Sequence, residues 1–209
     1  MLAALTPAPV TIAPTRRIIQ LLVGLWLYGA SMALQIRAAL GLNPWDVLHE
    51  GLAERTGLSF GTVTALVGVL VLLCWLPLRQ RPGVGTVSNV LVIGVAVDVT
   101  LALLPAPTGL AVRVLLLAGG VVLNGLAAAV YIGARLGPGP RDGLTTGFCA
   151  RTGTSLRLVR TAVEVIVLAA GWLLGGTVGV GTVLYALAIG PLTQAFLPPV
   201  TWVRPRPAA

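Results

Sequence analysis

Gly41-Leu-Asn-Pro-Trp-Asp-Val-Leu-His-Glu-Gly51 has a related counterpart 96 residues later in the chain, Gly137-Pro-Gly-Pro-Arg-Asp-Gly-Leu-Thr-Thr-Gly147. Sliding the chain by 96 residues without a gap extends the match. Residues 41–94 and 137–190 are identical at 23 of 54 positions, many of them Gly, Pro or polar. Shared apolar composition does not produce such identities, so the chain contains an internal repeat.

The quoted stretches have the features of short helices. Asn43 can cap a helix, Pro44 suits the first helical position, and Asp46 places an acid in the first turn. Gly57 then favours an end, which gives a helix of about 12 residues, or ~18 Å, too short to cross a membrane. The second copy, from Gly139 to Gly153, repeats the pattern. The first copy is charged enough to lie in the membrane interface, and the second is apolar and small enough to dip into the membrane; the sequence leaves the choice between these placements open.

The surrounding sequence is that of a multi-pass membrane protein. Of its 209 residues, 56% are hydrophobic and only 10% are charged. The apolar residues gather in runs of about 18 to 21, close to what a ~30 Å hydrocarbon core requires. We therefore predict an all-α transmembrane bundle of six spans, at residues 18–36, 61–78, 84–104, 114–134, 161–176 and 182–198.

The repeat predicts how these spans are organised. Each half holds three spans, an odd number, so the second half enters the membrane from the opposite side. Such inverted pairs build many secondary transporters. If the short segments crossed the membrane as well, the repeat would be parallel. The predicted order is a tail at 1–15, repeats at 16–104 and 112–200, and a tail at 201–209.

The arginines predict the orientation. With the N-terminus in the cytoplasm, 11 of the 14 basic residues fall in cytoplasmic segments, and only Arg37, Arg55 and Arg113 lie on the other side. The positive-inside rule therefore places both termini in the cytoplasm. It also explains the net charge of +8 without nucleic acid.

Five charged residues are candidates for a solute site. Asp46 and Asp142 are equivalent in the repeat, and each can either cap its short helix or contact a ligand. Arg141 can bind an anion at the start of the second short helix, or it can simply be one of the cytoplasmic arginines that set membrane topology. Glu164 and Asp98 lie within predicted spans, where an ionisable group usually faces a partner or a water-filled path. Glu164 can alternatively pair with Arg160, and Asp98 can have a structural partner.

Other features indicate structure more than chemistry. Gly83-Val-Gly-Thr-Val87 recurs as Gly179-Val-Gly-Thr-Val183. The motif predicts either a tight turn with a helix cap or a turn whose backbone N–H groups bind an anion. His49 is predicted to be solvated. Asn124 and Tyr185 are expected to hydrogen-bond between helices. The cysteines show no metal-ligand spacing, so no metal or other cofactor is expected.

The sequence resembles the YczE/YyaS/YitT-type bacterial membrane proteins, and the YczE group in particular. The motifs that carry the resemblance are GLNPWDVLHEGLAERTGLSFG at 41–61 and GPGPRDGLTTGFCARTGTSLRLVR at 137–160, and it extends over about residues 16–200. It implies a polytopic plasma-membrane protein. It supplies no catalytic residues.

The sequence therefore predicts a plasma-membrane protein that binds and translocates a small anionic or zwitterionic solute between two repeats, beside the five candidate residues. The alternative is a non-transporting accessory or regulatory protein that scaffolds a partner. An enzyme is not expected, because the chain has no HExxH, no GxSxG and no paired His or Cys.

Overall fold

The computed structural model describes residues 7–203, and within this range it contains helices and no strand. The predicted all-α class is confirmed. The helices are α1 (Pro14–Ala38), α2 (Pro44–Thr56), α3 (Phe60–Leu73), α4 (Trp75–Leu78), α5 (Val84–Leu103), α6 (Leu110–Gly133), α7 (Pro140–Thr152), α8 (Leu156–Leu173) and α9 (Val180–Val200). Parts of the two predicted tails, at 1–6 and 204–209, lie outside the described residues.

The internal repeat is visible in the helix bounds. The short helices α2 and α7 each have 13 residues and begin at Pro44 and Pro140, 96 residues apart. Each ends at a glycine in the left-handed region, Gly57 at φ 72° and Gly153 at φ 69°. Both short helices thus follow the start and stop signals of the sequence. α5 and α9 also begin 96 residues apart.

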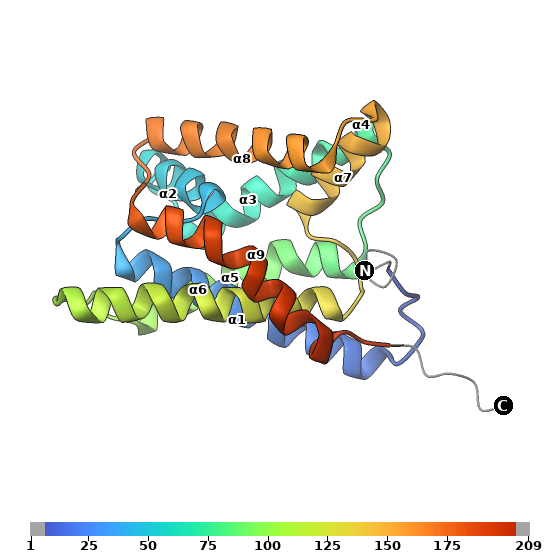
Figure 1. The fold of residues 1–209 in the computed structure, drawn as a ribbon, viewed down its shortest axis with the longest axis horizontal. Helices are drawn as coiled ribbons and strands as arrows, with labels where there is room; N and C mark the ends of the chain where they lie inside the picture. Colours follow the sequence, from blue (N-terminus) through green and yellow to red (C-terminus); the bar gives the residue numbers. More distant parts are fainter. Residues whose placement is uncertain (1–6, 204–209) are drawn as a thin grey trace.

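The helices form two layers (Figure 1). One layer holds α1, α5, α6 and α9, in which α1 packs against α5 and α6, and α6 packs against α9. The other layer holds α2, α3, α4, α7 and α8, in which α2 packs against α8, and α7 against α3, α4 and α8. Buried side chains such as Leu25 and Met32 fill the first layer, and Val63 and Val167 fill the second.

Five helical segments are long and apolar enough to cross a membrane: α1, α3 with α4, α5, α6 and α9. α8 is the exception among the six predicted spans. It has 18 residues but carries Arg157, Arg160 and Glu164. Large apolar side chains are exposed along these helices, including Leu70, Leu91 and Leu187, all at least 60% exposed. Such surfaces suit contact with lipid.

Two equivalent arginines join α1 and α6, one at each end of the helix pair. Arg17, in the first turn of α1, donates from Nε to the carbonyl O of Ala134 at 2.9 Å, just beyond the end of α6. Arg113, 96 residues later in the first turn of α6, donates from Nε to the carbonyl O of Ala38 at 2.7 Å, at the end of α1. Because each helix begins beside the end of the other, α1 and α6 run antiparallel.

Among the described helices, the two layers pack most closely on one side. α3 packs closely against α5, and a Cβ built on Gly94 would lie 2.7 Å from the carbonyl O of Gly61. The equivalent helices α8 and α9 make no comparable packing. Gly190, the equivalent of Gly94, has nothing within 4 Å of such a Cβ. The bundle is therefore closed between α3 and α5 and open between α8 and α9.

The difference between the two sides predicts opposite outcomes for equivalent substitutions. Gly94→Ala should lower the thermal midpoint of the detergent-solubilised protein, because overpacking against the Gly61 backbone costs about 1–3 kcal/mol. Gly190→Ala should raise the midpoint slightly or leave it unchanged, because alanine favours a helix by up to ~1 kcal/mol over glycine. Equal midpoints for the two variants would contradict the asymmetric packing.

Candidate functional site

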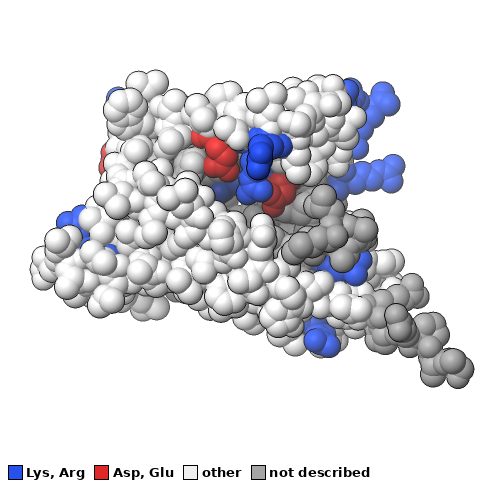
Figure 2. Space-filling model, viewed as in Figure 1, with Lys and Arg blue, Asp and Glu red and all other residues white. Residues whose placement is uncertain are grey.

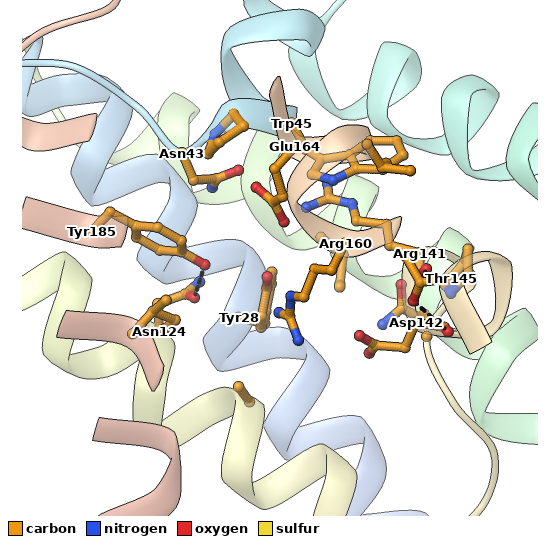
Figure 3. A pocket seen from close by; sticks show the side chains of 18 of the residues that line it. Tyr28, Asn43, Trp45, Asn124, Arg141, Asp142, Thr145, Arg160, Glu164 and Tyr185 are labelled. Carbon is orange, nitrogen blue, oxygen red and sulfur yellow. Dashed lines mark hydrogen bonds between the residues drawn. The ribbon is translucent and has the colours of Figure 1, made fainter. Parts of the chain in front are cut away.

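A cavity of about 640 Å³ lies between the two layers. Helices from both halves of the chain line it, with side chains from α1, α2, α3, α5, α6, α7, α8 and α9 (Figure 3). Its size falls within the range of small-molecule sites. Four charged side chains are among its lining residues: Arg141, Asp142, Arg160 and Glu164.

The cavity lies where equivalent residues of the two halves meet. Many lining residues occur in pairs that are 96 positions apart, so both copies of one repeat position face the same space. These pairs include Tyr28 and Asn124, Pro44 and Pro140, Trp45 and Arg141, His49 and Thr145, Thr64 and Arg160, Gly68 and Glu164, and Asn89 and Tyr185. The cavity therefore sits at the centre of the duplicated structure.

Trp45 and Arg141 mark this centre. They are equivalent in the repeat, and the guanidinium carbon of Arg141 lies 4.7 Å from the centroid of the Trp45 ring. Nη2 of Arg141 also lies 3.8 Å from Oδ1 of Asp46. The ring face and the carboxylate both attract the cation, and they hold it where the first turns of α2 and α7 approach each other.

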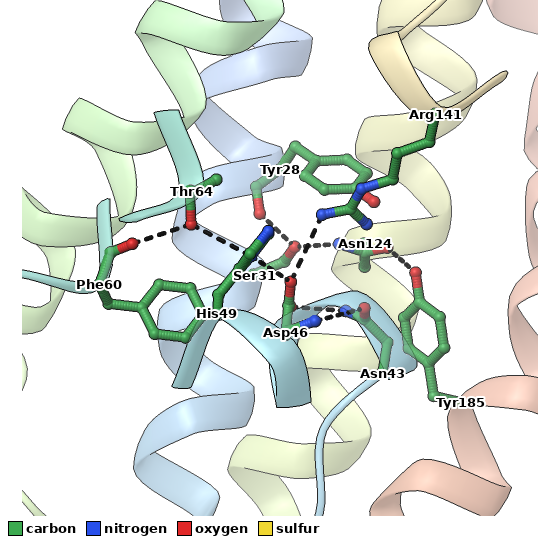
Figure 4. A network of polar contacts seen from close by, with 10 residues as sticks. All are labelled: Tyr28, Ser31, Asn43, Asp46, His49, Phe60, Thr64, Asn124, Arg141 and Tyr185. Atoms are coloured by element: carbon green, nitrogen blue, oxygen red, sulfur yellow. Dashed lines mark hydrogen bonds and ion pairs between the residues drawn. The ribbon is translucent and has the colours of Figure 1, made fainter. Parts of the chain in front are cut away.

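Asp46 is buried, with 1% of its side chain exposed. Its Oδ2 accepts a hydrogen bond of 2.5 Å from Nδ2 of Asn43, whose Oδ1 in turn accepts from the backbone N–H of Asp46 at 3.1 Å. Among the described residues Oδ1 of Asp46 has no hydrogen-bond partner and is left to the longer contacts with Arg141 and His49 (Figure 4). Asn43 thus caps α2 and orients Asp46 toward the centre.

Asp142 differs from Asp46 because of one substitution. The equivalent of Asn43 is Gly139, which has no side chain to hold the carboxylate. Asp142 is half-buried and lines the cavity, and its Oδ2 would lie 3.5 Å from a Cβ built on Gly139. The first copy of the motif is therefore closed by an internal hydrogen bond, and the second presents its carboxylate to the cavity.

His49 is buried, so the prediction that it is solvated was wrong. Its side chain is 1% exposed, and Nδ1 lies 3.2 Å from Oγ1 of Thr64 and 3.5 Å from Oδ1 of Asp46. Burial lowers the pKa of His49 below its usual value, which favours the neutral ring at pH 7. Its neighbours Trp45, Asp46 and Val47 on the same short helix are buried as well.

Glu164 and Arg160 reach the cavity from α8. They are one turn apart, but within the described chain Glu164 makes no ion pair, so the pairing considered from the sequence is absent there. Glu164 is half-buried and Arg160 is exposed. Both charges are directed into the open space between the layers (Figure 3), where a ligand or water can reach them.

Asp98 lies apart from the other four candidates. Its Oδ1 accepts from the backbone N–H of Gly61 at 2.7 Å, and its Oδ2 accepts from Oγ of Ser59 at 2.6 Å. It therefore caps α3 from α5, which is the structural partnership considered from the sequence. Its equivalent Gln194 lines the cavity instead.

The repeated Gly-Val-Gly-Thr-Val motif forms a turn and a helix cap. The hydroxyls of Thr86 and Thr182 accept from the backbone N–H groups of Gly83 and Gly179 at 3.1 and 3.2 Å. Each motif also crosses to the other half of the chain. The N–H of Gly85 donates to Leu136 at 2.9 Å, and that of Gly181 donates to Leu40 at 2.7 Å. The motifs thus hold the loops that lead into α7 and α2.

The predicted interhelical hydrogen bonds of Asn124 and Tyr185 are confirmed. The Tyr185 hydroxyl donates to Oδ1 of Asn124 at 2.9 Å, and Nδ2 of Asn124 donates to Oγ of Ser31 at 2.7 Å. Sequence reasoning missed that these two residues, with Tyr28 and Trp45, also line the cavity. The repeat offset could have revealed them, because Tyr28 is equivalent to Asn124.

Comparison with known proteins supports the resemblance seen in the sequence. Residues 15–198 match the "Family of unknown function (DUF6198)". An uncharacterised protein of Haemophilus influenzae is 41% identical over 85% of this chain and 81% of its own. The uncharacterised membrane protein YczE of Bacillus subtilis is 35% identical over 82% of this chain and 80% of its own. YyaS of the same organism, also uncharacterised, is 27% identical over 84% of this chain and 90% of its own. No solved structure matches.

The contacts of Asp98 predict its contribution to stability. Asp98→Ala should lower the free energy of unfolding by about 1–2 kcal/mol, because two donors at the start of α3 lose their acceptor. The matched variant Gln194→Ala should change it by less than about 0.5 kcal/mol, because Gln194 is exposed. Denaturant unfolding in mild detergent measures both, and a larger loss for Gln194→Ala would contradict the assigned role.

Proposed function

We propose that this chain, an integral membrane protein that belongs to the DUF6198 family, binds a small anionic or zwitterionic solute in the cavity and carries it across the plasma membrane. One observation carries the proposal. The cavity is charged, lies inside a bundle of apolar helices, and is lined at equivalent positions by both halves of the chain. The proposed activity breaks no covalent bond and uses no cofactor or nucleic acid.

We infer that the halves are inverted repeats of three spans each. The antiparallel course of α1 and α6, tied by Arg17 and Arg113, supports this inference. An axis in the membrane plane would pass through the cavity, as in many secondary transporters. α8 would be the sixth span, about 27 Å long. Its charged residues Arg160 and Glu164 line the cavity, where water or a ligand can reach them.

The arginine distribution orients the protein in this proposal. With both termini in the cytoplasm, the ends of α8 and α9 near Ser155 and Gln194 face the cytoplasm. The ends of α3 and α5 near Ser59 and Asp98 face outward, with Arg55 nearby in sequence. The cavity would then be open toward the cytoplasm and closed toward the outside.

Transport requires the outer end to open in turn. The hydrogen bonds from Ser59 and Gly61 to Asp98 hold that end closed and are the contacts that must break. These two hydrogen bonds can form and break at a modest cost in free energy, about 1–2 kcal/mol for the loss of Asp98 as their shared acceptor. Asp98 would then act at a gate, and the four cavity charges would act on the solute.

Cysteine labelling tests the proposal without knowledge of the solute. In a variant with Cys74→Ser and Cys149→Ser, Thr193→Cys places one thiol on the cavity wall. A membrane-impermeant maleimide should modify it from either side of the membrane, because the cavity opens to each in turn. Thr152→Cys, at the predicted cytoplasmic end of α7, should react only from the cytoplasm.

A second variant links the result to the gate. Adding Ser59→Cys and Asp98→Cys, joined by a short thiol cross-linker before labelling, should abolish modification of Thr193→Cys from outside and leave cytoplasmic labelling intact. If the cavity thiol reacts from the cytoplasm alone in every variant, translocation is refuted. The non-transporting accessory role would then be the better account.

A further inference from the structure

The cavity has a lateral mouth, formed where α8 and α9 fail to pack. Figure 2 shows basic and acidic side chains in a hollow between α8, above, and α9, below. Thr161, Glu164 and Val165 of α8 and Ala186 and Gly190 of α9 line the cavity at this gap. The mouth therefore runs along two helices rather than only past their ends.

The sequence explains why this mouth stays open. On α3, the small residues Gly61 and Gly68 allow close contact with α5, and a Cβ on Gly68 would already lie 3.1 Å from Val90. The equivalent residues on α8 are Arg157 and Glu164, and Thr64 is replaced by Arg160. These long charged side chains prevent α8 from approaching α9 as α3 approaches α5. The repeat has thus diverged at the positions that would close it.

The rim of the mouth is apolar and accessible. Val165 lines the cavity and is 59% exposed. On the facing helix, Ala186 lines the cavity and is exposed. In a bilayer these side chains contact acyl chains, so the mouth connects a charged interior directly with the lipid phase. An ionised side chain that faces hydrocarbon is costly unless a polar group accompanies it.

Taking the transport function above as given, we propose that the solute is an amphipathic lipid with a phosphate and an ammonium in its head group, which enters laterally between α8 and α9. Its head group lies among the cavity charges, and its acyl chains stay between the two helices and in the bilayer. Arg160 and Arg141 suit the phosphate, since guanidinium groups bind phosphate through two parallel hydrogen bonds. Glu164 and Asp142 suit the ammonium.

Vesicles that contain the full chain test this proposal. The probe is phosphatidylethanolamine with a fluorophore on one acyl chain, and an impermeant reductant added outside reports which leaflet holds it. The wild-type chain should move the probe between leaflets at least tenfold faster than protein-free vesicles. Arg160→Gln and Glu164→Gln should each reduce the rate severalfold. Arg151→Gln, on α7 but outside the cavity, should keep the wild-type rate.

A second arm distinguishes a lipid from a soluble ligand with the same head group. Glycerophosphoethanolamine, at millimolar concentration, should neither protect Thr193→Cys from maleimide nor slow the lipid probe. Protection by this compound without any movement of the probe would overturn lateral lipid entry and leave solute transport standing. If the lipid probe does not move, Thr193→Cys still reacts from both sides and glycerophosphoethanolamine gives no protection, the lipid proposal is refuted and solute transport stands. Size-exclusion profiles of the variants check that each is folded.

Discussion

The structure depends on the need to satisfy the backbone polar groups of two loops, each of which leads into a short helix that stops inside the protein. α2 and α7 are too short to cross a membrane, and their first turns lie beside a central cavity. Free N–H and carbonyl groups are costly in an apolar interior, so partners must come from elsewhere in the chain. Gly85 and Gly181 supply them across the repeat, by donating to the loops that precede α7 and α2. The two halves therefore fold as one unit.

Much of this arrangement could be predicted from the sequence because it is encoded locally. Pro44 and Gly57 set the ends of α2, and their equivalents set those of α7. The 96-residue offset, read from Gly, Pro and Asp identities, carries over to the helix bounds. Apolar runs of the right length identified five helices that can span a membrane. Six spans and their inversion remain predictions, since α8 carries three charged residues.

The candidate site was harder to predict because it depends on contacts between distant residues. Spacing alone could not indicate that Arg141 stacks on Trp45, or that His49 is buried against Thr64. Nor could it separate Asp98, which caps α3, from Glu164, which faces the cavity. Equivalent positions that carry different residues, such as Asn43 and Gly139, were the missed signal. At such positions the two halves have diverged, and the cavity acquires its asymmetry.

A solute can reach the cavity charges because the bundle is closed between α3 and α5 and open between α8 and α9. Paired spin labels in lipid vesicles measure this difference. Leu70 and Leu91 report on the closed side, and their equivalents Ile166 and Leu187 report on the open side; all four are at least 60% exposed. We expect a clearly longer distance for the pair at 166 and 187 than for the pair at 70 and 91. Equal distances would contradict it.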